Sequence, residues 1–275
     1  MKNIDKKVVK DFGEEWNTFK QSDIEKKDLE DAWNQYFSIF PFNKLPANAV
    51  GFDMGCGSGR WAMLTSLKVG HLHCIDASEK ALSVAKENLA NINHITFHHG
   101  SVSDGILDDD SQDFGYCLGV LHHIPDTLDG LKSCSRMLKT GAPFLLYLYY
   151  NFENRSLLFK TIWKISNILR WSISKLPSNI KKIITFIIAM IIYFPLARFS
   201  LLIEKIGINP HFLPLSDYRK KNFNFMATDS LDRFGTRLEK RFSKSDITNM
   251  LLKSGFENIT FSSTQPYWVC ISYKS

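Results

Sequence analysis

A run of glycines between residues 51 and 59 is the feature of the sequence that most directly indicates chemistry. It reads Gly51-Phe-Asp53-Met-Gly55-Cys56-Gly57-Ser58-Gly59-Arg60, an apolar strand that passes into glycines and then into an expected helix. Glycine permits positive φ and lets a ligand approach the main chain, and the helix offers free N–H groups. The dinucleotide fingerprint GxGxxG requires glycine where this chain has Arg60. The pattern predicts a nucleotide-like ligand and makes NAD the weaker candidate.

Asp76 is the second acid of this pattern and stands about 17 residues beyond Gly59. It ends an expected strand at 71–76. A carboxylate at that place can accept hydrogen bonds from both hydroxyls of a ribose. The alternative is a structural glycine turn followed by an accidental acid, and the order strand, loop, helix, acid favours the ligand site.

Two adjacent histidines, His122 and His123, follow an expected strand at 114–118, on the carboxyl edge of the sheet where ligands collect. Either imidazole could act as a general base that removes the proton of a hydroxyl group on a ligand. The favoured alternative is that both rings shape the pocket. His98 and His99 add two imidazoles, but adjacent strand residues point to opposite faces and no acid completes a set. No metal is predicted.

These residues need a sheet to position them, and the chain alternates short apolar strands with helical segments, as parallel sheets do. Strands are expected at 49–54, 71–76, 95–98, 114–118, 143–149, 259–262 and 267–273, and helices at 60–68, 79–89, 128–138 and 246–252. Two amphipathic helices are expected within 4–40. The predicted fold is α/β, a doubly wound, seven-stranded, mostly parallel sheet with N-terminal helices and a mainly helical insertion.

In these motifs the chain resembles the class I S-adenosylmethionine-dependent methyltransferases, especially the small-molecule branch that includes quinone-biosynthesis enzymes. The carriers are Phe52 to Gly59, Cys74-Ile75-Asp76-Ala77-Ser78, Gly100-Ser101-Val102 and Leu118 to Asp126. The resemblance implies that the glycines wrap the methionine moiety, Asp76 holds the ribose, and Ser101 with Val102 flanks the adenine. The residues that it implies for binding the cofactor, S-adenosyl-L-methionine, are Asp53, Gly55, Cys56, Gly57, Gly59, Asp76, Ala77, Ser101, Val102 and Leu118.

Ser101 departs from the family pattern. Many relatives have an acid there, which accepts a hydrogen bond from the adenine amino group. Because serine is a weaker acceptor, that contact is expected to pass to the backbone or to Asp104.

A long insertion between residues 151 and 241 divides the chain into 1–150, 151–241 and 242–275. Residues 151–221 carry 12 Lys and Arg against 3 Asp and Glu, a net charge of +9, and the rest of the chain is acidic. The run Ile183–Ala197 is about 15 residues without a charge, shorter than a membrane-spanning helix needs, with Pro195 expected to bend or end it. The favoured interpretation is a cap packed on the core. Peripheral membrane contact through 157–206 and a homodimer remain the alternatives.

The acceptor site is expected near Tyr149, Tyr218, Arg219 and Arg237, where guanidinium groups could clamp a carboxylate or phosphate. A solvated basic face is the alternative. The first helix could cover the cofactor with Phe12, Trp16 and Phe19, and simple core packing is the alternative for that stripe.

Composition limits the class of protein. With 275 residues, 44% hydrophobic and 23% charged, the chain is neither disordered nor collagen-like nor a coiled coil. Five widely spaced cysteines and a first segment unlike a signal peptide predict a cytoplasmic protein. Nucleic acid is disfavoured because the basic segment lacks regularly interleaved aromatic residues. The favoured function is methyl transfer to oxygen on a small-molecule or lipid-linked acceptor. The alternative is a noncatalytic, membrane-peripheral interaction protein that retains the fold.

Overall fold

The structure is a computed structural model that describes residues 1–18 and 26–275. Its contacts divide the described chain into two compact units. The first, the sheet unit, comprises Met1–Glu153 and Leu238–Ser275, and the second, the helical unit, comprises Asn154–Arg237. The insertion expected at 151–241 is thus a few residues longer at both ends than the helical unit.

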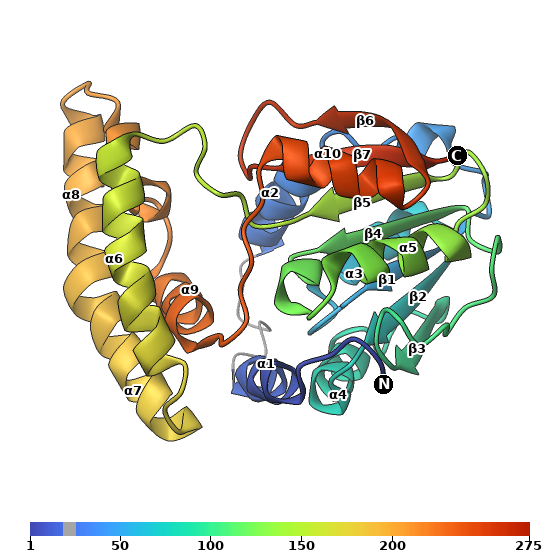
Figure 1. Ribbon diagram of the computed structural model, residues 1–275, viewed down its shortest axis with the longest axis horizontal. Coiled ribbons are helices and arrows are strands. Elements are labelled where there is room, and N and C mark those ends of the chain that lie inside the picture. The colour runs from blue at the N-terminus through green and yellow to red at the C-terminus, as the bar shows by residue number, and fades with distance from the viewer. Residues whose placement is uncertain (19–25) are drawn as a thin grey trace. The chain divides into compact units, whose positions relative to one another are not determined.

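The sheet unit contains, within the described residues, one sheet of seven strands in the order β3-β2-β1-β4-β5-β7-β6 (Figure 1). The strands are β1 (Val50–Met54), β2 (His71–Asp76), β3 (Ile95–His99), β4 (Phe114–Leu118), β5 (Pro143–Tyr147), β6 (Phe256–Phe261) and β7 (Val269–Lys274). Pairing from β3 to β5 is parallel, and β7 runs antiparallel to β5 and β6. This confirms the predicted doubly wound, mostly parallel α/β fold closed by a hairpin.

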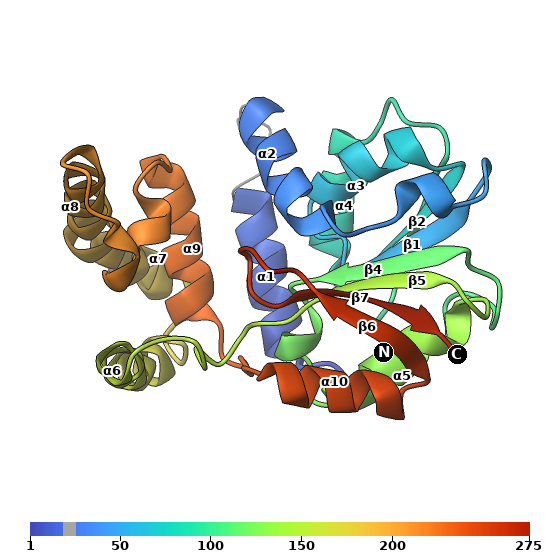
Figure 2. The same cartoon turned by 90° about the horizontal axis from the view of Figure 1, so that it is seen from above.

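Helices cover both faces of the sheet (Figure 2). On one face lie α2 (Lys26–Phe37), α3 (Arg60–Thr65) and α4 (Glu79–Asn88), and on the other lie α5 (Thr127–Met137) and α10 (Lys244–Lys253). The strands therefore bury both faces: Phe144 and Leu146 of β5 pack with the α5 side, and Leu145 between them packs with the α3 side. α1 (Lys6–Thr18) packs against α4.

β5 ends at Tyr147, two residues earlier than predicted, so Tyr149 follows the strand. The chain leaves the sheet there because it pairs with the segment that returns from the helical unit. The Phe242 amide donates to the Tyr149 carbonyl at 2.8 Å, and the Asn151 amide donates to the Phe242 carbonyl at 3.0 Å. The returning segment thereby comes to lie beside the carboxyl end of β5.

The helical unit is built on α6 (Leu157–Ile173), α7 (Ser178–Ile188), α8 (Phe194–Lys205) and α9 (Phe223–Gly235). A π turn at Ala189–Tyr193 joins α7 to α8 in one 28-residue helix, so Pro195 neither ends the helix nor separates its halves. Pro195 lies in the first turn of α8, directly after the widened π turn. There its missing N–H and bulky ring are accommodated by the altered hydrogen-bonding pattern.

The length of this helix corrects the prediction that the apolar run is too short to span a bilayer. By length and composition alone, Ser178–Lys205 is long and apolar enough to cross a membrane, with 28% of its most apolar window buried. The prediction counted only the charge-free residues, whereas the helix extends past charges at both ends. Such a helix is weak evidence for a membrane span when it stands alone.

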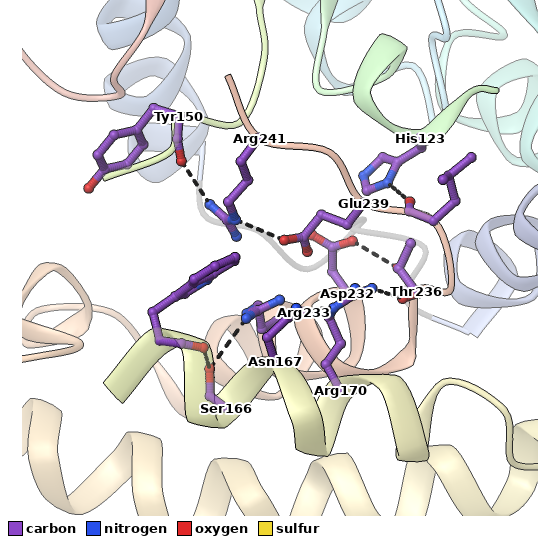
Figure 3. A network of polar contacts seen from close by, with 12 residues as sticks. His123, Tyr150, Ser166, Asn167, Arg170, Asp232, Arg233, Thr236, Glu239 and Arg241 are labelled. Atoms are coloured by element: carbon purple, nitrogen blue, oxygen red, sulfur yellow. Dashed lines mark hydrogen bonds and ion pairs between the residues drawn. The ribbon is translucent and has the colours of Figure 1, made fainter. Parts of the chain in front are cut away.

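Much of the apolar side of α6 is exposed. A surface helix normally turns its apolar side inward. Here Ile165 and Ile168 are 59% and 68% exposed, whereas Arg170 is 9% exposed. Arg170 is drawn inward because its guanidinium donates to the Thr236 carbonyl at 2.9 Å and to Asn167 Oδ1 at 2.7 Å (Figure 3).

Candidate functional site

The glycine loop follows β1 and is fastened to the end of β2. The amides of Gly55 and Cys56 both donate to the Ile75 carbonyl, at 2.8 and 3.0 Å. Gly55 has φ +79°, and a Cβ there would lie 2.3 Å from Val120 Cγ2. Gly59 has the same φ and caps α3. Only glycine fits these positions without strain, so the loop keeps its main chain bare at the start of a helix.

Asp76 turns its carboxylate toward this loop, as predicted. Its Oδ2 accepts from the Gly57 amide at 2.9 Å, and its Oδ1 accepts from the Ser78 amide at 2.8 Å. Each oxygen keeps a second acceptor position, because an ionised carboxylate has about four lone-pair sites. Burial raises the pKa of Asp76, and the two amide donors oppose that effect. The remaining acceptor position on each oxygen of Asp76 suits a pair of neighbouring hydroxyl groups.

Asp53 lies one strand away and is 1% exposed. Burial raises its pKa to about 8, the Tyr116 hydroxyl that donates to Oδ2 at 3.0 Å lowers it in part, and the negative charge of Asp76 raises it further. A positive charge bound beside these two acids would favour the ionised form of both. The two acidic side chains therefore suit a positively charged nucleoside.

The predicted adenine residues lie beyond β3. The Ser101 hydroxyl donates to the Lys2 carbonyl at 2.7 Å, and the Ser101 amide donates to Asp104 Oδ2 at 2.8 Å. Asp104 therefore supplies a carboxylate beside the position where relatives have an acid. Val102 is 6% exposed and belongs to the apolar core, and Leu118 is 8% exposed at the end of β4. The Ala77 carbonyl contacts His99 Nε2 at 3.1 Å.

Helix α1 lies over this edge of the sheet. A Cβ on Gly57 would lie 3.2 Å from the indole of Trp16, and the rings of Phe12 and His123 are 4.9 Å apart. Gly13 lets the helix approach closely, since a Cβ there would lie 2.3 Å from Ser78 Oγ. Two members of the predicted stripe thus face the glycine loop and the histidines. The third, Phe19, lies outside the described residues.

His122 and His123 occupy a short 3-10 turn after β4 and have different environments. His123 Nδ1 lies 2.7 Å from the Leu238 carbonyl, a contact that requires a proton on Nδ1 and leaves Nε2 as the basic nitrogen (Figure 3). His122 is fully buried and stacks on Tyr149 with centroids 3.8 Å apart. Burial, then the charges of His123 and Arg241, hold the pKa of His122 well below its usual value.

His122 has a further property that bears on ligand binding. Among the residues the structure describes, none hydrogen-bonds to either ring nitrogen. An unpartnered buried nitrogen costs about 1–3 kcal/mol, so a hydrogen-bonding ligand beside it would gain that much.

Arg241 and Glu239 complete this group, and the predicted acceptor residues did not include them. Arg241 Nε donates to Glu239 Oε1 at 2.8 Å (Figure 3). The Arg241 guanidinium lies 5.0 Å from the centre of the Tyr149 ring. Arg241 also donates to the Tyr150 carbonyl at 3.3 Å. The sequence feature that could have identified Arg241 is the cluster of basic residues before the helix cap at Ser243. The prediction selected Arg237 from that cluster.

The other predicted acceptor residues belong to the helical unit. Arg219 donates to Glu204 Oε1 at 2.8 Å and to the Ser216 carbonyl at 2.9 Å. The hydrogen bond from Arg219, with a second from Lys220, lowers the pKa of Glu204 to about 2. The Arg219 guanidinium is thus engaged within its own unit. Tyr218 packs beside Tyr193 with centroids 5.5 Å apart, and the Arg237 carbonyl accepts from Arg170. Over residues 1–18 and 26–275, no group of three or more metal-ligating side chains is found.

Comparison with known proteins agrees with this geometry. Residues 52–146 match the family model described as a methyltransferase domain. Demethylmenaquinone methyltransferase of Staphylococcus aureus (strain JH9) is 35% identical over 92 residues, which are 32% of this chain and 38% of that protein. The chain thus spans well under half the length of the curated relatives it matches.

Two solved structures share the fold over most of this chain. One is phosphoethanolamine N-methyltransferase 2 of Haemonchus contortus, in complex with phosphomonomethylethanolamine and S-adenosylhomocysteine, at TM-score 0.51 and 16% identity over 85% of this chain and 39% of that one. The other is a possible exported protein of Bordetella parapertussis, at TM-score 0.54 and 15% identity over 90% of this chain and 67% of that one.

Proposed function

Because residues 52–146 form a class I S-adenosylmethionine-dependent methyltransferase domain, we propose that the protein transfers a methyl group from that cofactor to a hydroxyl of a small-molecule or lipid-linked acceptor. The observation that carries the proposal is the Asp76 carboxylate, which faces the bare main chain of the glycine loop at 2.9 Å from the Gly57 amide. The staphylococcal relative, a demethylmenaquinone methyltransferase, supports a small-molecule acceptor.

The cofactor would supply an electrophilic methyl group on a positively charged sulfur. Asp76 would accept the ribose hydroxyls, the main chain at Gly55 and Gly57 would contact the methionine moiety, and Asp104 with Ser101 would border the adenine. The Asp76 carboxylate at the loop would favour binding of the positive charge. Trp16 would exclude water from the loop.

His123 is the best-placed base for a hydroxyl acceptor. Its Nδ1 proton is held by the Leu238 carbonyl, so Nε2 can accept the acceptor's proton as the new carbon–oxygen bond forms and the carbon–sulfur bond breaks. Such a base contributes about 10²- to 10⁴-fold in rate. His122, held neutral by burial, would position the acceptor by a hydrogen bond. Tyr149 and Arg241 would form the wall beside it.

Calorimetry with S-adenosylmethionine tests the proposal at its cofactor site. Wild type should bind, Asp76→Ala should lose about 100-fold or more in affinity because two charge-assisted hydrogen bonds disappear, and Asp109→Ala, an exposed acid, should bind as wild type. Mass spectrometry of phenolic, quinol and amine acceptors incubated with enzyme and cofactor then identifies the methylated atom. Cofactor binding that is insensitive to Asp76→Ala would overturn the assignment.

Absence of methyl transfer to every acceptor, together with tight cofactor binding, would favour the second candidate, a noncatalytic protein that retains the fold. The observation that keeps this candidate is the size of the helical unit, which supplies none of the groups around the glycine loop described above.

A further inference from the structure

We propose that the helical unit docks on the surface of an anionic phospholipid bilayer through the outward faces of α6 and of the α7–α8 helix. This goes beyond the methyl-transfer proposal and does not depend on it. It is argued from residues of the helical unit alone.

The first observation is that the α7–α8 helix exposes its apolar side and buries its small and polar side, the reverse of an ordinary soluble helix. Its buried stripe recurs every three or four residues and is small or polar; the members are Lys181, Thr185, Ala189, Tyr193, Ala197 and Ser200. Its exposed side is apolar and includes Ile183 at 61%, Ile191 at 59% and Leu202 at 60%. Water does not stabilise such an arrangement, whereas a hydrocarbon surface does.

The buried polar groups are hydrogen-bonded, so the inversion is a built feature. The Lys181 ammonium donates to the Gly235 carbonyl at 3.3 Å, and the Ser230 hydroxyl donates to the Thr185 carbonyl at 2.8 Å. Both partners belong to α9 or its end, and α9 lies along α7 in both views (Figures 1 and 2). These polar contacts act together with a small apolar core that includes Ile173, Met226 and Phe234, and many other apolar side chains of the helix remain on the outside.

The second observation is that α6 repeats this inversion. Arg170 is directed inward, and Ile165, Ile168 and Leu169 are more than half exposed. Trp171 is 60% exposed, with the Lys175 ammonium 3.0 Å from the centre of its ring. An exposed tryptophan beside a lysine is typical of side chains at a membrane–water interface.

Charge indicates which lipid surface is suitable. Residues 151–221 carry 12 Lys and Arg against 3 Asp and Glu, a net charge of +9, of which the buried Arg170 and Lys181 supply two. Exposed lysines stand near the ends of the apolar faces, Lys175 after α6 and Lys205 at the end of α8. Each basic residue near an anionic surface contributes about 1 kcal/mol to binding.

The occupant is a bilayer surface and not a bilayer interior. The side of α7 opposite its apolar face is covered by α9, which carries Asp229, Asp232 and Arg233. A spanning position would bring these charges to the depth of the acyl chains, where they are costly. Lying in the interface leaves α9 on the aqueous side.

Vesicle flotation with the full chain tests the proposal. Wild type should float with vesicles that contain roughly one third phosphatidylglycerol and much less with neutral phosphatidylcholine vesicles. The variant Ile183→Glu with Ile191→Glu should lower the partition coefficient about tenfold or more. The matched control, Asn224→Glu with Asn249→Glu, makes the same change of net charge at exposed positions and should float nearly as wild type.

Thermal unfolding and size-exclusion chromatography of each variant show whether it is folded and in what oligomeric state. No flotation of wild type, or equal loss in both double variants, would overturn the proposal. Two other results would also overturn it. One is retention of the chain in membranes after alkaline carbonate washing, which indicates a span. The other is a wild-type dimer that the isoleucine variant converts to a monomer without any vesicle binding, which indicates that a second copy covers the face.

Discussion

The sheet unit and the helical unit distribute their apolar residues in opposite ways. In the sheet unit Phe52, Phe144 and Phe256 are almost fully buried, and among the described Asp, Glu, Lys and Arg residues of this unit only Asp53 is buried. In the helical unit Arg170 and Lys181 are buried, and isoleucines cover the outside. The helical unit also has a small apolar core, which includes Ile173, Met226 and Phe234, so the two units differ mainly in their exposed faces. The solvent for which a surface is built has to be inferred from both faces of a helix together.

The largest expected effect contrasts apolar truncation in the two units. Phe144→Ala should lower the free energy of unfolding by about 3–5 kcal/mol because it leaves a cavity between Phe52 and Phe256. Ile168→Ala in α6 should change it by less than about 0.5 kcal/mol because that side chain is exposed. Urea denaturation monitored by circular dichroism measures both. Equal losses would show that the exposed face of α6 is covered in solution.

The second prediction sharpens the role of the carboxyl edge. His123→Gln should lower kcat about 10²- to 10⁴-fold at an unchanged affinity for the cofactor, because it removes the proposed base and keeps a hydrogen-bond donor toward Leu238. His122→Phe should raise KM for the acceptor more than it lowers kcat, since it removes a positioning group. Steady-state kinetics over a pH range separates these cases. A His123→Gln enzyme with the wild-type pH profile would exclude the base.

The third prediction tests whether polar contacts stabilise the helical unit. Arg170→Met keeps most of the side-chain volume but leaves the Thr236 carbonyl without its guanidinium donor. It should cost about 1–3 kcal/mol of unfolding free energy, more than Ile168→Ala in the same helix. Denaturation of the two variants side by side checks the order. The reverse order would mean that α6 packs in the ordinary way.

The fourth prediction concerns the pH dependence of the unfolding free energy, which has the smallest expected effect per pH unit. Because burial raises the pKa of Asp53 from 3.8 in the unfolded chain to about 8, the folded form binds more protons between these values, and stability from this group falls as pH rises through that window. Relative to Asp53→Asn, wild type should lose up to about 1.4 kcal/mol per pH unit. Unfolding free energies of both proteins at pH 5 to pH 9, about one unit apart, measure the difference. A constant difference would contradict a protonated, buried Asp53.

The sheet unit was predictable because its signals are local. Short apolar runs and the glycines between them fix strand and helix ends to within a few residues. Asp76 was located because the end of a parallel strand is also the edge where ligands bind. The end of β5 was predicted two residues too late, at Tyr149. The bridge between Tyr150 and Phe242 draws the chain away from the sheet there, and it joins segments that are far apart in the sequence.

The helical unit was less predictable because helical periodicity gives the spacing of a stripe but not the direction it faces. The isoleucines of α6 satisfy the pattern for an inward apolar face, and only the contacts of Arg170 show that the opposite side is inward. Arg241 was overlooked for a related reason. Several basic residues stand close together before Ser243, and contacts with Tyr150 and Glu239 distinguish one of them.

The π turn at Ala189–Tyr193 has a geometric consequence for this long helix. The buried stripe from Lys181 to Ser200 advances mostly by four residues, and at about 100° per residue each such step would rotate it by about 40° around the axis. One extra residue in a wide turn cancels about 100° of that rotation, so the stripe stays on one side of the helix. Deleting a single residue there would restore regular α-helix and leave Ala197 and Ser200 on the buried side, whereas inserting a residue into a regular turn would rotate them by about 100°. The π turn therefore keeps the apolar residues on one side and the small and polar residues on the other along the 28-residue helix.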